Sequence, residues 1–205
     1  MRKILLAFIL SLTSNSSFAN SNLLILGDSL SAGYQMQPEE SWPYLLQSRV
    51  SEHNITIINA SISGDTAGNG ADRLPALLDN HQPHYVLIAL GANDGLRGFP
   101  PAKTRQHLQT MIQASQQAGA QVLLMQIRVP PNYGQRYSQL FEAIYPDLSV
   151  EFNIPLLPFF LEAIIENPAY MMQDGIHPNP SAQPLIRDLL YDALQPLFEQ
   201  TLLTQ

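Results

Sequence analysis

A short run of large apolar residues that ends in a tight polar turn constrains this chain more than any other feature. Leu23-Leu24-Ile25-Leu26 is followed at once by Gly27-Asp28-Ser29. A run of this length and bulk is typical of a strand buried on both faces of a parallel sheet, and Gly-Asp favours a turn directly after it. Ligands bind outside the carboxyl ends of the strands in such sheets. The segment therefore predicts that the Ser29 hydroxyl faces a binding site, unless Gly-Asp-Ser is only a turn in which serine caps a helix.

The chain that follows alternates strand-like and helix-like segments. The pattern predicts strands at 22–26, 55–60, 85–90, 121–127 and 154–157. It predicts helices at 41–53, 101–118, 135–152 and 180–203, a poor helix at 65–80 that contains Gly68, Gly70 and Pro75, and an irregular segment with a helical part at 158–173. Five strands separated by helices predict a doubly wound α/β sandwich with a parallel sheet, most like the flavodoxin arrangement.

The first nineteen residues have the pattern of a secretory signal peptide. Arg2 and Lys3 precede a short apolar region, and the small residues Ser17 and Ala19 occupy the positions −3 and −1 of a cleavage site. The apolar region is shorter than the roughly 20 residues that a spanning helix needs. We therefore expect cleavage after Ala19, export to the periplasm, no stable membrane insertion, and one mature domain at 20–205.

The mature chain is acidic and lacks cysteine. Without residues 1–19 it has 8 Lys and Arg against 17 Asp and Glu, a formal charge of −9. This balance argues against nucleic acid as a partner. The absence of cysteine excludes disulfides, a thiolate nucleophile and cysteine metal ligands. Since no apolar surface stripe is evident, we expect a monomer that acts on a small molecule.

Small and polar residues follow three of the predicted strands. Gly27-Asp28-Ser29, Ser63-Gly64-Asp65 and Gly91-Ala92-Asn93-Asp94 come after the first, second and third strands. If the sheet is parallel, the three clusters share one edge. A fourth cluster, Asp174-Gly175-Ile176-His177-Pro178, lies near the end of the chain.

Ser29 needs a base if it is to act as a nucleophile, because a free hydroxyl is a weak one. His177 is the best candidate among the five histidines, since it lies in a short loop with Asp174 three residues earlier. A carboxylate at that spacing can orient the imidazole and stabilise the imidazolium. The other four occupy a helix end, the opposite sheet edge or a polar helix face, and we expect them to be structural: His53, His81, His84 and His107.

Acyl transfer also needs donors for a developing oxyanion. The candidates are the backbone N–H groups of Ser29 and Gly64 and the side-chain amide of Asn93. Taken singly, Gly64 and Asn93 are equally consistent with turn chemistry.

These clusters together resemble the four sequence blocks of the SGNH (GDSL) hydrolases in order and spacing. The resemblance covers essentially the whole mature chain and implies a three-layer α/β/α fold around a flavodoxin-like five-stranded parallel sheet. It implies Ser29 as nucleophile, His177 as base and Asp174 as its orienting residue, with Ser29, Gly64 and Asn93 as oxyanion hole. It further implies a serine hydrolase that cleaves acyl esters and thioesters, such as acyl-CoA, aryl esters and lysophospholipids, through an acyl-enzyme without metal or cofactor.

The resemblance also implies that the loop after Asn93 moves when an acyl chain binds. Glycines at both ends suit a hinge, and two apolar side chains suit a cover for the acyl chain; the loop is Gly95, Leu96, Arg97, Gly98, Phe99 and Pro100. Substrate choice is expected to depend on the less distinctive segment 161–173.

Three other functions stay open from the sequence. A sugar-ester deacetylase of the same family would share the catalytic residues and differ in chain-length preference. A metallophosphoesterase would need histidine ligands near Asp28 or Asp94, and none is close in sequence. A binding module without catalysis would have no need of these residues together.

Overall fold

The computed structural model describes residues 21–203, and the predicted signal peptide lies outside them. The strands are β1 (Ser21–Gly27), β2 (Ile55–Asn59), β3 (Tyr85–Ala89), β4 (Gln121–Met125) and β5 (Leu156–Leu157). The α-helices are α1 (Ser29–Ala32), α2 (Trp42–Val50), α3 (Ala67–His81), α4 (Ala92–Leu96), α5 (Pro101–Gln117), α6 (Gln135–Glu142), α7 (Ile144–Phe152) and α8 (Gln183–Leu203). Short 3-10 helices connect them: η1 (Pro38–Glu40), η2 (Ser51–His53), η3 (Pro131–Tyr133), η4 (Phe160–Ala163), η5 (Pro168–Tyr170) and η6 (Pro180–Ala182).

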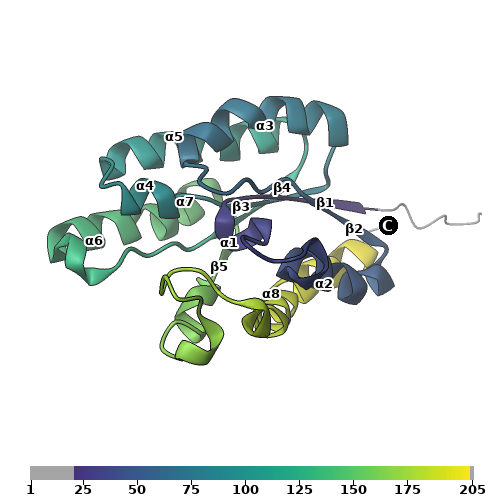
Figure 1. Cartoon of the computed structure of the whole chain (residues 1–205). Coiled ribbons are helices and arrows are strands. Elements are labelled where there is room, and N and C mark those ends of the chain that lie inside the picture. Colours follow the sequence, from purple (N-terminus) through teal and green to yellow (C-terminus); the bar gives the residue numbers. More distant parts are fainter. Residues whose placement is uncertain (1–20, 204–205) are drawn as a thin grey trace, which may run out of the picture.

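The five strands form one parallel sheet in the order β2-β1-β3-β4-β5. Helices α3 and α5 pack together over one face, and α2 and α8 pack together over the other (Figure 1). This is the flavodoxin-like strand order in a three-layer α/β/α sandwich, so the predicted fold class is confirmed. In the part of the chain that is described, no helix is long and apolar enough to cross a membrane.

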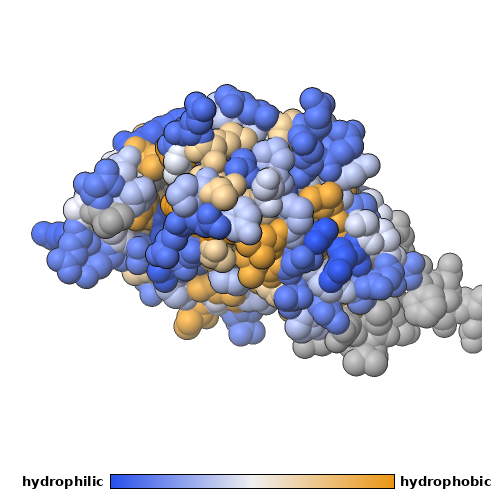
Figure 2. Space-filling view, turned by 60° about the horizontal axis from the view of Figure 1, so that its bottom comes forward, coloured by the Kyte–Doolittle hydropathy of each residue, from blue (hydrophilic) through white to orange (hydrophobic). Residues whose placement is uncertain are grey.

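Strands β1 and β3 form the middle of the core. Four consecutive β1 residues, from Leu23 to Leu26, are fully buried, as are Val86, Leu87 and Ile88 in β3. Apolar side chains on both faces of these strands pack against the two helical layers, which explains the uninterrupted hydrophobic runs in the sequence. On the outer face seen in Figure 2, hydrophilic residues predominate and apolar residues are exposed in separate patches between them.

Helix α3 is regular over fifteen residues, whereas the sequence predicted only a poor helix at 65–80. Thr66 caps its first turn, because its Oγ1 accepts from Asn69 N while Asn69 Oδ1 accepts from Thr66 N. Leu74 and Leu78 are buried in the core on either side of Pro75. Packing of this apolar face therefore outweighs the low helix propensity of the two glycines and the proline.

The predicted helix at 135–152 is wrong as a single helix, since the structure has α6 and α7 separated at Ala143. Pro146 lies in the first turn of α7, and a proline has no N–H to donate to the carbonyl of Glu142 four residues earlier. Gln126 Nε2 donates to that carbonyl instead, at 3.2 Å. The missing donor of one proline thus explains the break.

Two glycines in α3 provide a matched test of this packing. A Cβ added at Gly70 would lie 2.2 Å from Leu90 Cδ1, whereas a Cβ at Gly68 would meet nothing nearer than 3.5 Å. We expect Gly70→Ala to lower the free energy of unfolding by about 1–3 kcal/mol through overpacking. Gly68→Ala should raise it by up to about 1 kcal/mol, because alanine is the better helix former. Urea unfolding followed by circular dichroism measures both, and equal effects would contradict the close packing of Gly70 against Leu90.

Candidate active site

Ser29 is the first residue of α1, which begins directly at the carboxyl end of β1. Asp28 caps this helix, with its Oδ1 accepting from Leu30 N at 3.0 Å. The N–H groups in the first turn of a helix have no carbonyl acceptor within the helix. The backbone N–H of Ser29, the first residue of α1, therefore has no acceptor within the helix.

His177 lies in the loop before α8, and a local turn orients its ring. Asp174 Oδ1 accepts from the backbone N–H groups of Ile176 and His177, at 2.9 and 3.0 Å. Asp174 Oδ2 lies 2.7 Å from His177 Nδ1. The carboxylate therefore holds both the backbone and the ring of His177, as the spacing of three residues predicted.

The structure brings Ser29 and His177 together across 148 residues of chain, with His177 Nε2 at 2.8 Å from Ser29 Oγ. Because Asp174 can only accept at Nδ1, that nitrogen carries the proton and Nε2 is left to accept from the serine hydroxyl. Serine, histidine and aspartate are thus connected in the order that activates a nucleophile.

The electrostatics of this chain favour an ionised Asp174. The backbone N–H of His177 is the largest cause, and with the His177 ring and the backbone N–H of Ile176 it lowers the pKa of Asp174 to about 2. A carboxylate that is charged at all working pH values can stabilise a positive charge on the imidazole without taking its proton.

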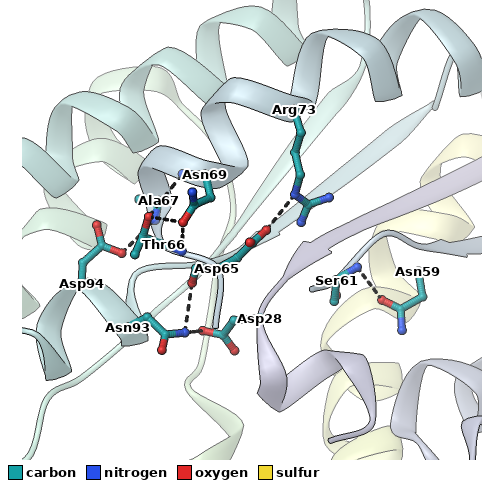
Figure 3. A network of polar contacts seen from close by, with 10 residues as sticks. All are labelled: Asp28, Asn59, Ser61, Asp65, Thr66, Ala67, Asn69, Arg73, Asn93 and Asp94. Atoms are coloured by element: carbon teal, nitrogen blue, oxygen red, sulfur yellow. Dashed lines mark hydrogen bonds and ion pairs between the residues drawn. The ribbon is translucent and has the colours of Figure 1, made fainter. Parts of the chain in front are cut away.

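Gly64 and Asn93 approach Ser29 from the ends of the neighbouring strands. Gly64 lies in the turn between β2 and α3 with φ +85, a conformation that favours glycine. Asn93 Nδ2 donates to the carbonyl of Asp65 at 3.0 Å and lies 3.4 Å from Asp28 Oδ2 (Figure 3). The three expected oxyanion donors therefore lie along one cavity, as expected for strand ends that share an edge.

This cavity of about 650 Å³ opens at the Ser29–His177 pair and has a mostly apolar lining. Its far side consists of residues from the loop after β4 and from the segment around η4. The apolar lining residues are Leu30, Ala92, Leu96, Val129, Pro130, Phe159, Leu161, Ile165 and Ile176. An ion pair between Arg128 and Glu162, at 2.7 Å, and the Asp28 carboxylate are charged groups in the lining. Such a cavity fits an apolar chain attached to a reacting carbonyl group.

The expected hinge in the loop 95–100 is only partly matched. Gly95 belongs to α4 and is buried, and a Cβ there would lie 2.1 Å from Val129 Cγ1. Close packing therefore explains the glycine at this position, and its role as a hinge stays a prediction. Gly98, with φ +68 and open space around it, keeps the freedom that a hinge needs. Leu96 lines the cavity, whereas Phe99 is exposed.

This loop is held at several points. Arg97 Nη2 donates to the carbonyl of Gly64 at 3.0 Å. The hydroxyl groups of Tyr133 and Tyr137 donate to the carbonyls of Leu96 and Phe99, both at 2.8 Å. The loop is therefore connected to the turn that contains Gly64, to η3 and to α6.

The site includes two residues that were not among the site residues expected from the sequence. The ring of Tyr34 packs against the His177 ring, with 4.3 Å between the ring centroids. Asp28, 1% exposed, lies between Ser29 and Asn93. The sequence shows that Asp28 adjoins the proposed nucleophile, but it gives no signal for the burial of this carboxylate.

The four other histidines lie away from Ser29, as expected. His53 Nε2 contacts the hydroxyl of Tyr191 at 3.2 Å, and His84 Nδ1 accepts from Asn22 N at the amino end of β1. His107 is half-buried beside Gly68, although the sequence predicted a solvated side chain. Within residues 21–203, no cluster of three or more His, Cys, Asp and Glu side chains is arranged to hold a metal ion.

A parallel α/β sheet with a connected serine, histidine and aspartate at its carboxyl edge defines a hydrolase of the serine type. The sequence profile of the GDSL-like Lipase/Acylhydrolase family matches residues 25–183. The chain belongs to this family and is an acylhydrolase, which confirms the resemblance inferred from the sequence.

Known relatives agree with this assignment. An arylesterase of Vibrio mimicus is 56% identical over 183 residues, 88% of this chain and 92% of the relative. Thioesterase 1/protease 1/lysophospholipase L1 of Escherichia coli K12 is 53% identical over 190 residues, 93% of this chain and 90% of the relative. A crystal structure of the psychrotrophic esterase EstA from Pseudoalteromonas sp., inhibited by monoethylphosphonate, is 46% identical with a TM-score of 0.84, and the match covers 87% of this chain and 99% of EstA.

The Asp174–His177 contact leads to a specific prediction. In Asp174→Asn the amide can still accept from the loop N–H groups, but its NH₂ faces Nδ1 and favours the wrong tautomer. We expect kcat for a p-nitrophenyl ester to fall by about 10²- to 10⁴-fold with little change in thermal stability. Asp72→Asn, at an exposed position of α3, is the control. Retention of full activity by Asp174→Asn would exclude Asp174 as the residue that orients the base.

Proposed function

We propose that this acylhydrolase cleaves acyl esters and thioesters through an acyl-enzyme on Ser29. The observation that carries the proposal is the hydrogen-bonded series Ser29 Oγ, His177 and Asp174 at the mouth of an apolar cavity. His177 Nε2 accepts the proton of Ser29 while Oγ attacks the carbonyl carbon. Asp174 stabilises the imidazolium that results.

The negative charge on the carbonyl oxygen then needs donors. We assign the backbone N–H groups of Ser29 and Gly64 and the side-chain N–H of Asn93 to this role, each typically responsible for a factor of about 10²–10³ in turnover. His177 next gives its proton to the leaving alcohol or thiol. Water, deprotonated by the same nitrogen, hydrolyses the acyl-enzyme and frees Ser29.

The cavity supports an acyl chain as the part of the substrate that is bound. Its lining is mostly apolar, and Leu96, Val129 and Ile176 lie where a chain attached to the reacting carbonyl would extend. The names of the relatives include arylesterase, thioesterase and lysophospholipase. We therefore propose aryl esters, acyl-CoA and lysophospholipids as substrate classes, with loop 95–100 and the segment 161–173 contributing to chain-length preference.

We also propose that the enzyme acts in the periplasm. The support is the sequence of residues 1–19, with its basic start, short apolar region and small residues before Ala19. The substrate is a small molecule, and the reaction as written needs only water and the side chains and backbone N–H groups named above.

The proposed nucleophile can be tested by covalent labelling. A p-nitrophenyl alkylphosphonate should increase the mass of the wild-type protein by one phosphonyl group, since Oγ displaces p-nitrophenolate at phosphorus. Ser29→Ala should remain unlabelled and inactive. Ser31→Ala, two residues further in α1 with a buried Oγ, should be labelled like the wild type. Mass spectrometry of the intact protein and of its peptides decides, and label on Ser29→Ala would contradict the proposal.

A second measurement separates this function from sugar-ester deacetylation. Each buried methylene contributes about 0.8 kcal/mol, or roughly fourfold in kcat/KM. We expect kcat/KM of p-nitrophenyl esters to rise by up to that factor per methylene from acetate to hexanoate. Leu96→Ser should flatten this dependence, whereas Leu140→Ser, exposed on α6, should not. Hydrolysis of acetate alone would favour the deacetylase.

A further inference from the structure

Asp28 is a buried carboxylate that the proposed reaction does not use. It is 1% exposed and lies at the carboxyl end of β1, next to Ser29 in the chain. Its Oδ1 is occupied by the N–H of Leu30, which it caps at 3.0 Å. Its Oδ2 faces Nδ2 of Asn93 at 3.4 Å (Figure 3). One carboxylate thus contacts both the helix that carries the nucleophile and the side chain assigned to the oxyanion.

The surroundings of Asn93 determine which end of its amide points where. The carbonyl oxygen of Asp65 accepts from Nδ2 at 3.0 Å, and an ionised Asp28 can only accept as well. Two acceptors on one side exclude an orientation that turns Oδ1 toward them. The amide nitrogen is therefore held beside Asp28, in the lining of the cavity that also contains Ser29.

We propose that Asp28 is a positioning residue that acts through Asn93. Its carboxylate accepts the second amide hydrogen of Asn93 and so keeps the amide nitrogen, not the amide oxygen, in position until the oxyanion of the tetrahedral intermediate accepts that hydrogen instead. The separation of 3.4 Å is long for a hydrogen bond. Little hydrogen-bond energy is therefore lost when this hydrogen leaves Asp28 for the oxyanion. The inference rests on the proposed role of Asn93 in the oxyanion hole.

Burial disfavours the ionised form of Asp28, so the proposed role of this carboxylate depends on pH. Burial raises the pKa of Asp28 to about 6, against the lowering effects of the Leu30 N–H and of the charge on His177. The carboxylates of Asp65 and Asp94 also raise it. Asp65 is paired with Arg73 at 2.8 Å, and Asp94 accepts from Ala67 N and the Thr104 hydroxyl. Asp28 is the group of this cluster that faces the amide of Asn93.

Protonation of Asp28 would replace an acceptor by a hydroxyl donor and release the amide. Two groups must then be unprotonated for full turnover, His177 and Asp28. The acid limb of kcat against pH should be steeper in the wild type than in a variant without the Asp28 carboxylate.

A double-mutant cycle tests the link between Asp28 and Asn93. In Asp28→Asn the new side chain can still cap α1 with its oxygen, but its NH₂ then faces the NH₂ of Asn93, donor against donor. With p-nitrophenyl butyrate we expect kcat to fall about tenfold with KM nearly unchanged, less than the loss in Asn93→Ala, which removes the donor itself. In the Asn93→Ala background, Asp28→Asn should change kcat by less than twofold. If Asp28→Asn fails to fold by circular dichroism, Asp28→Ser keeps a capping oxygen and enters the same cycle.

Asp94→Asn is the matched control, because Asp94 is equally buried and adjacent to Asn93 in the chain but bonds to Ala67 and Thr104. The factors by which Asp94→Asn and Asn93→Ala lower kcat should multiply in the double variant, as expected for independent positions. If the effects of Asp28→Asn and Asn93→Ala also multiply, or if Asp28→Asn leaves kcat and its acid limb unchanged, the inference is overturned while the proposed function stands. If Asn93→Ala itself retains full turnover, the oxyanion assignment fails and this inference fails with it.

Discussion

The parallel pairing of β1 with β2 and β3 is the constraint on which the site depends. Because all three strands run in one direction, their carboxyl ends meet at one edge, where Ser29, Gly64 and Asn93 follow them. The strands behind this edge are buried on both faces, so the polar groups needed for chemistry can gather only where the strands end. His177 is then brought to Ser29 by the connection into α8, which packs beside α2 on one face of the sheet (Figure 1).

Because many polar groups lie at this one edge of the sheet, each buried group needs a hydrogen-bond partner close by. Asp94 shows how this is done, because its two oxygens accept from the backbone N–H of Ala67 in α3 and from the Thr104 hydroxyl in α5. Burial nevertheless raises the pKa of Asp94, as it does for Asp28. In both carboxylates, hydrogen bonds offset only part of the effect of burial. Next to them, the orientation of the Asn93 amide depends on its two acceptors.

A stack of aromatic rings supports the same edge from the side of α6 and α7. Tyr133, Tyr137, Phe141 and Tyr145 follow one another with ring centroids 5.9–6.2 Å apart. The hydroxyl of Tyr145 donates to the carbonyl of Leu90 at 3.0 Å, directly before the turn into α4. A Cβ at Gly91 would lie 2.1 Å from this hydroxyl, which explains a glycine at that position. The stack thus fixes the backbone that presents Asn93.

Local pattern was sufficient to predict the strands, the doubly wound sheet and the grouping of Ser29, His177 and Asp174, which are hydrogen-bonded in series. Hydrophobic runs, turn residues and a spacing of three residues all act within a few residues of the chain. The helix break at Ala143 was missed, although Pro146 is a local signal for it. The regularity of α3 depends on packing against β1 and α5, and the packing role of Gly95 depends on Val129 and Phe141. Only the tertiary structure therefore decided them. The same holds for Asp28. Its sequence position shows that it adjoins the nucleophile, but its burial and its contact with Asn93, 65 residues away, arise only when two strand ends meet.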